Sequence, residues 1–95
     1  MSKFNNIPVE KDTEIIFRAE NKFGDLDVVY EKWEWDGTLA ESIIFDEDDV
    51  SEMNDDEIIN KVKDSPLFDE KLYKGDPTIR HNSGFVFVNF NFIIK

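Results

Sequence analysis

Hydrophobic and polar residues alternate along the first half of the chain, which is the pattern of half-buried β-strands. Residues 13–20 alternate in this way, and Ile15, Phe17 and Ala19 are expected on the buried side of one strand. A loop follows, in which Gly24 is free to adopt a positive φ. The pattern therefore predicts that the chain begins its folded part with a strand and a turn.

The dipeptide Asp36-Gly37 predicts a tight hairpin between a second strand, residues 26–35, and a third strand that begins at residue 38. A two-residue loop fixes the register, because residues equally distant from the turn then lie opposite each other. This register places Lys32 opposite Glu41 and Trp33 opposite Ala40, and both are favourable cross-strand pairs. The other expected pairs are Trp35–Thr38, Glu34–Leu39, Glu31–Ser42, Tyr30–Ile43, Val29–Ile44 and Val28–Phe45.

The start of a helix is marked by several residues that act together. Asn54 is the predicted N-cap, and Glu57 at the third helical position completes a capping box. Met53 and Ile58 occupy the two positions of a hydrophobic staple. The helix is therefore expected to begin within about two residues of Asp55.

The C-terminal third of the chain is less regular. Residues 65–75 have the composition of a second short helix, and turns are predicted at residues 76–77 and 82–84. Residues 85–94 predict a long strand with one unbroken apolar side. Because such a strand would aggregate at an exposed edge, we expect it inside the sheet, paired on both sides.

These elements predict a single α+β domain over residues 1–95, with the order β-β-β-α-(α)-β. The fold is an antiparallel sheet of about four strands with one or two short helices on one face. Residues 1–12 are predicted to form an arm that Phe4 and Ile7 anchor. Nine phenylalanines supply core material, which argues against a disordered acidic tail.

The chain is strongly acidic, with 22 Asp and Glu against 11 Lys and Arg and a net charge of −11. Binding nucleic acid or an anionic membrane requires basic side chains, so direct binding of either is not expected. The charge is uneven, because residues 10–57 carry 18 acidic and only four basic side chains. A basic protein is the partner that such a field attracts, and solubility is the alternative explanation.

Features that carry catalysis are missing from the sequence. There is no cysteine, which excludes disulfides and thiol chemistry, and no glycine-rich phosphate loop. The single histidine, His81, lies in a turn-rich stretch. We therefore expect that this protein is not an enzyme and that it has neither catalytic residues nor a cofactor. No signal peptide or membrane span is visible, so a cytoplasmic location is expected.

The acidic segment partly matches the pattern of a calcium-binding loop. Asp46, Asp48 and Glu57 match the first, third and twelfth positions of a calcium-binding loop. Val50 and Ser51 stand where an oxygen ligand and a glycine are needed, so no metal site is assigned.

The candidate site is a set of carboxylates. Capping explains the acids at the start of the helix, but it explains the consecutive acids of residues 46–49 less well, and these repel one another. Alternate strand residues are about 6.7 Å apart, which is comparable to the spacing of phosphates along a DNA strand. A row of carboxylates could therefore imitate phosphates. The predicted partner-binding residues are Asp46, Glu47, Asp48, Asp49, Glu31, Glu34, Glu41 and Glu52.

The leading hypothesis is a small inhibitor or decoy that occupies the basic surface of a nucleic-acid-binding protein or nuclease. In size and acidity the chain is similar to phage-encoded anti-defence proteins such as anti-CRISPRs, although it shares no motif with them. One alternative is an immunity protein or antitoxin that blocks a toxic nuclease. Another is a structural or regulatory component of an assembly, whose acidity serves solubility. Trp33 and Trp35 share one strand face and are either core residues or binding anchors.

Overall fold

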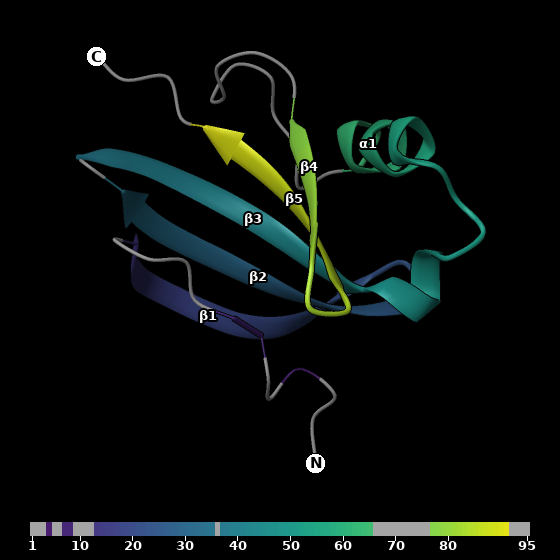
Figure 1. Ribbon diagram of the computed structural model, residues 1–95, viewed down its shortest axis with the longest axis horizontal. Coiled ribbons are helices and arrows are strands. Elements are labelled where there is room, and N and C mark those ends of the chain that lie inside the picture. The colour runs from purple at the N-terminus through teal and green to yellow at the C-terminus, as the bar shows by residue number, and fades with distance from the viewer. Residues whose placement is uncertain (1–3, 5–6, 9–12, 36, 66–76, 92–95) are drawn as a thin grey trace.

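A computed structural model of the chain describes residues 4, 7–8, 13–35, 37–65 and 77–91. The strands form one antiparallel sheet in the order β1-β2-β3-β5-β4, and α1 lies beside β4 at one end of it (Figure 1). The α+β class is therefore correct in outline, but the described part has five strands and one α-helix. The elements are β1 (Thr13–Phe23), β2 (Leu26–Trp35), β3 (Thr38–Asp46), the 3-10 helix η1 (Glu47–Val50), α1 (Asp55–Lys63), β4 (Thr78–Asn82) and β5 (Phe85–Asn91).

The hairpin of β2 and β3 has the predicted register throughout. Every expected pair is present, from Trp35–Thr38 beside the turn to Val28–Phe45 at the far end. The preceding loop is shorter than predicted, because β1 continues to Phe23 and only two residues connect it to β2. Gly24 in that connection has a φ of 62°, as a tight turn requires.

The expected alternation in β1 is wrong at one position. Ile15 lies opposite Trp33 and Phe17 lies opposite Lys32, so Ile16 is an extra residue that forms a β-bulge. A bulge reverses the alternation, and Ile15 and Phe17 therefore project from opposite faces of the sheet. Ile16 and Phe17 are 51% and 53% exposed, so Phe17 is not the core residue that the pattern indicated.

Strand β4 (Thr78–Asn82) lies between the two predicted turns, in residues for which no strand was predicted. It joins β5 through Ser83-Gly84, whose φ values of 55° and 86° are both positive, as a type I′ hairpin turn requires. Residues 78–82 contain one large apolar residue, Ile79, so they lack the pattern of a half-buried strand. Pairing with β5 makes them a strand, and β5 occupies the predicted interior position between β3 and β4.

Helix α1 begins at the predicted residue, and its cap has the predicted geometry. The Asn54 Oδ1 accepts the Glu57 N–H at 2.8 Å, and the Glu57 carboxylate accepts the Asn54 N–H at 3.1 Å. Ile58 and Val62 are buried against the sheet, and Met53 packs on the same core. The predicted second helix beyond Ser65 lies outside the described residues, as does the predicted end of the last strand at residues 92–94.

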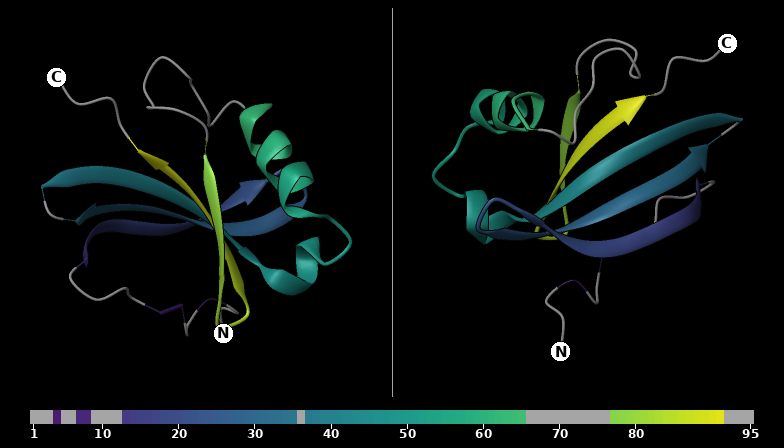
Figure 2. Two further views of the ribbon diagram at one scale, coloured as in Figure 1. Left: turned by 45° about the horizontal axis from the view of Figure 1, so that its top comes forward. Right: turned by 180° about the vertical axis from the view of Figure 1, so that it is seen from behind.

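The sheet has an apolar core on each face, and α1 covers one of the two faces (Figure 2). On the face opposite α1, which we call the arm face, Phe4 and Ile7 are buried, as expected for the two predicted anchor residues. The Phe4 ring centroid lies 6.1 Å from that of Phe85. Within the described part, no helix is long and apolar enough to cross a membrane. The helix-face core consists of Phe23, Val28, Ile43, Phe45, Val50, Ile58, Val62, Val86, Val88 and Phe90.

Candidate protein-binding surface

Exposed carboxylates gather where β3 passes into η1 and where α1 begins. Asp46, the last residue of β3, is the N-cap of η1, because its Oδ1 accepts the Asp48 N–H at 2.9 Å. The Glu47 N–H donates to the Gly84 carbonyl at 3.0 Å, which ties the start of η1 to the β4–β5 turn. The acidic run therefore has a defined shape, and Asp46 has a structural role that the sequence analysis missed.

His81 on β4 joins the two acidic segments. Its Nδ1 lies 3.3 Å from the Glu47 Oε2, and its Nε2 lies 2.8 Å from the Asp55 Oδ1. The hydrogen bond to Asp55 and then the one to Glu47 raise the pKa of His81 above its ordinary value of 6.5. These two contacts connect η1 with the first turn of α1, so the carboxylates of the two segments lie on one surface.

We define the acidic surface as the exposed carboxylates of η1, the turn after it and the first turn of α1. Glu47, Asp48, Asp49 and Glu52, which the sequence analysis selected, all belong to it. Asp46 lies at its border, where it is half-buried. The complete acidic surface is Glu47, Asp48, Asp49, Glu52, Asp55, Asp56 and Glu57.

The other predicted binding residues lie on the strands and do not form a row with the acidic surface. Glu31 is buried on the arm face, where its Oε2 accepts the Arg18 Nε–H at 2.7 Å. Glu41 is 5% exposed and lies on the helix face, as does the exposed Glu34. The expected row of strand carboxylates is therefore interrupted in the described sheet, because neighbouring positions alternate between faces and two of the three side chains are buried.

A polar network crosses the arm face next to the Arg18–Glu31 ion pair. The Trp33 Nε1–H donates to the Ser42 Oγ at 2.8 Å, and the Ser42 hydroxyl donates to the Asn89 Oδ1 at 2.5 Å. Among the described residues, no buried side-chain nitrogen or oxygen lacks a hydrogen-bond partner. The half-buried Trp33 thus has a structural role in the sheet, whereas the Trp35 side chain lies outside the described part. No sequence signal indicated this network, because Ser42 and Asn89 are 47 positions apart.

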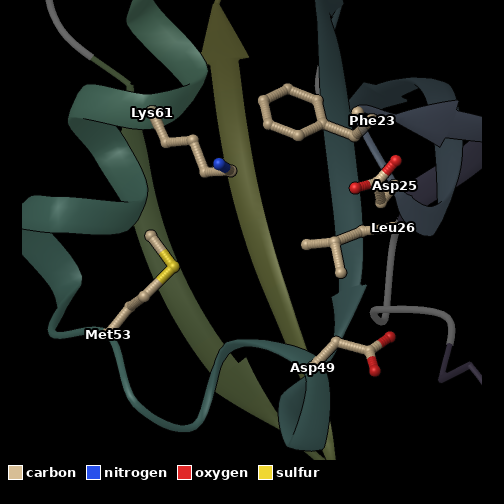
Figure 3. A pocket seen from close by; sticks show the side chains of 7 residues that line it. Phe23, Asp25, Leu26, Asp49, Met53 and Lys61 are labelled. Atoms are coloured by element: carbon tan, nitrogen blue, oxygen red, sulfur yellow. The ribbon is translucent and has the colours of Figure 1, made fainter.

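A pocket of about 410 Å³ lies beside the acidic surface, between the β1–β2 turn and α1 (Figure 3). Asp49 belongs both to the pocket and to the acidic surface. The pocket joins apolar side chains to charged ones, and the sequence analysis did not foresee it, since its walls come from separate elements. It is lined by Phe23, Gly24, Asp25, Leu26, Asp49, Met53 and Lys61.

The described residues do not form a metal centre. No group of three or more His, Asp or Glu side chains in the described ranges has the geometry to hold a metal ion. Asp46 and Glu57, which match positions of a calcium loop, direct their carboxylates at backbone N–H groups of η1 and of the α1 cap. These side chains therefore act as helix caps.

Neither a protein-family model, nor a curated protein, nor a solved structure matches this chain. No function is therefore inherited through a relationship, and a fold alone does not define one. The acidic surface, His81 and the pocket are the features from which a function can be argued.

Proposed function

We propose that this protein is an acidic inhibitor that binds a basic, nucleic-acid-binding surface of another protein and keeps nucleic acid away from it. The observation that carries the proposal is the acidic surface, in which exposed carboxylates from η1 and α1 adjoin through His81. Lys and Arg side chains that bind phosphates are the groups such a surface attracts. The protein acts by binding and needs no catalytic group.

The acidic surface is supported by fixed backbone elements. Asp46 caps η1, the Asn54–Glu57 capping box starts α1, and His81 connects the two. A binding surface that is already ordered loses less conformational entropy when a partner binds. The neighbouring carboxylates also repel one another in the free protein, and basic side chains of a partner would relieve that repulsion.

Charge of this kind acts mainly on the rate of association. Long-range attraction steers two oppositely charged proteins into contact, and added salt screens it, with a Debye length of about 8 Å at physiological ionic strength. Binding should therefore weaken steeply with added salt, and most of that loss should be in the association rate.

The proposal is tested with a variant that neutralises the acidic surface and keeps its supports. In the triple variant Asp48→Asn, Asp49→Asn and Glu52→Gln, the side chains that cap η1 and contact His81 are unchanged. Its melting temperature should stay close to that of the parent, because the side chains that cap η1 and contact His81 are retained. Its association rate with the basic partner recovered from the producing cells should fall, and the dependence of that rate on salt should become shallower.

A matched control changes the net charge by the same amount elsewhere. Glu14, Glu20 and Glu34 are exposed on β1 and β2, and their replacement by Gln also removes three negative charges. The control should associate faster than the first triple variant, because the charges next to the contact are retained. Equal rates for the two variants would show that net charge, and not the acidic surface, attracts the partner.

A second candidate function is that of an assembly component joined through apolar surface. Edge strand β1 carries the exposed Ile16 and Phe17, and Leu39 is 41% exposed. Exposed apolar side chains on an edge strand are a means of pairing with another chain. Such an association would change little with salt, and Phe17→Ser would weaken it more than the acidic triple variant would. The salt dependence of binding thus separates the two functions.

A further inference from the structure

Three apolar side chains, Phe23, Leu26 and Met53, take part in the lining of the pocket beside the acidic surface. Phe23 is buried, while Leu26 and Met53 are partly buried and pack against the helix-face core. Figure 3 shows the Lys61 side chain extending from α1 toward Phe23 and Leu26 on the sheet side, with Met53 below it on the α1 side. An inserted apolar side chain would therefore contact apolar atoms from both the helical and the sheet side.

Charged side chains at this pocket restrict what can enter it. Asp25 and Asp49 lie on the sheet and η1 side, and Lys61 lies across from them on α1 (Figure 3). No ion pair joins Asp25 or Lys61 to another side chain of the described ranges. The Lys61 ammonium disfavours insertion of a basic side chain, whereas the two carboxylates attract basic side chains to the outside of the pocket.

We propose that the pocket receives an apolar side chain of the basic partner, flanked in that partner by Lys or Arg. This inference rests on the proposed function, because the flanking basic residues are those that the acidic surface binds. Asp49 connects the two regions, so a single short segment could place its apolar side chain in the pocket and its basic side chains against the carboxylates. The apolar side chain supplies an anchor that charge alone does not provide. The acidic surface then determines the association rate, and the pocket determines the lifetime of the complex.

The test uses capped pentapeptides and nuclear magnetic resonance of the isotopically labelled full chain. One peptide has leucine between two pairs of arginine, and the other has serine in place of leucine. The leucine peptide should bind about ten- to a hundredfold more tightly, which corresponds to burial of one leucine side chain. It should shift the amide signals of Phe23, Leu26 and Met53 along the same saturation curve as those of Asp48 and Asp49. The serine peptide should shift only the acidic surface.

Two variants separate filling of the pocket from a change in fold. Lys61→Trp places a large side chain at the pocket and should remove the advantage of the leucine peptide. Asn60→Trp introduces the same side chain at the neighbouring exposed helix position, outside the pocket lining, and should keep that advantage. Circular dichroism spectra that match the parent would show that both variants are folded.

The possible outcomes distinguish the two proposals. If both peptides bind the acidic surface with equal affinity, the pocket is not an anchor site and the inference is wrong, while the proposed function stands. If neither peptide shifts the signals of the acidic surface, the proposed function fails, and the inference fails with it. If leucine strengthens binding in the Lys61→Trp variant as well, the apolar side chain binds somewhere other than this pocket.

Discussion

Replacing Phe45 by Ala should remove a large part of the stability of the fold. Phe45 is fully buried on the helix face, opposite Val28 in β2 and Val86 in β5. Its ring packs edge-to-face on Phe23, with centroids 5.4 Å apart. Loss of apolar burial costs about 1.5–3 kcal/mol, and loss of the ring pair adds about 0.5–1.5 kcal/mol. Because the paired strands on both sides limit collapse of the cavity, we expect a total of about 3–5 kcal/mol.

The loss is measured by urea denaturation followed by circular dichroism, with Phe17→Ala as the matched control. Phe17 loses the same atoms from a position that is 53% exposed, so the control should cost about 1 kcal/mol or less. A domain of this length has a total stability of about 5–14 kcal/mol, so the two variants should be easy to distinguish. Equal losses for the two variants, or a loss below about 1 kcal/mol at Phe45, would refute the assignment of the helix-face core.

Three further substitutions test the supports of the acidic surface. Asn54→Ala removes half of the capping box and should cost about 0.5–2 kcal/mol in urea denaturation; no loss would mean that the box does not form in solution. The carboxylates of Asp55 and Glu47 raise the pKa of His81, so His81 contributes stability below about pH 6.5 that is lost as the pH rises through the raised pKa. The parent should therefore have a higher melting temperature than His81→Gln, and this difference should be larger at about pH 5.5 than at about pH 8.5. A difference in melting temperature that does not change with pH would contradict this. Gly84→Ala should cost about 1–2 kcal/mol, because its φ of 86° disfavours a side chain, and unchanged stability would argue against the β4–β5 turn.

The features that could be predicted from the sequence are those set by residues close together in the chain. The two-residue turn at Asp36-Gly37 determined the whole register of β2 and β3, since equal distances from a turn define strand pairs. The start of α1 was equally predictable, because the side chains of Asn54 and Glu57 each accept the backbone N–H of the other residue within one turn. In both places a few neighbouring residues decide the local geometry.

The features that could not be predicted depend on residues far apart in the chain. Strand β4 exists through its pairing with β5, although the turn residues Ser83-Gly84 carried part of the signal for that hairpin. The bulge at Ile16 and the burial of Glu31 depend on how β1 lies against β2. Alternation alone assumes an uninterrupted strand with one buried face, and this sheet has a bulged edge strand and a core on each face.

The same distinction holds for the candidate site. The acidic run was visible in the sequence, and Glu47, Asp48, Asp49 and Glu52 are exposed. The contact of His81 with Glu47 spans 34 positions, so a lone histidine in a turn-rich stretch gave no sign of it. The pocket was equally invisible, because its walls come from β1, β2, η1 and α1 and the segment between the two helices.

Competition with nucleic acid tests the central claim most directly. The partner recovered from the producing cells is mixed with a fluorescent duplex or single-stranded oligonucleotide, and the fluorescence anisotropy is followed as this protein is added. The account predicts that the parent displaces the oligonucleotide until all of it is free, and that the Asp48→Asn, Asp49→Asn, Glu52→Gln variant needs a higher concentration to do so. A ternary complex, in which the partner holds the oligonucleotide and this protein together, would contradict the claim that the acidic surface occupies the nucleic-acid-binding surface.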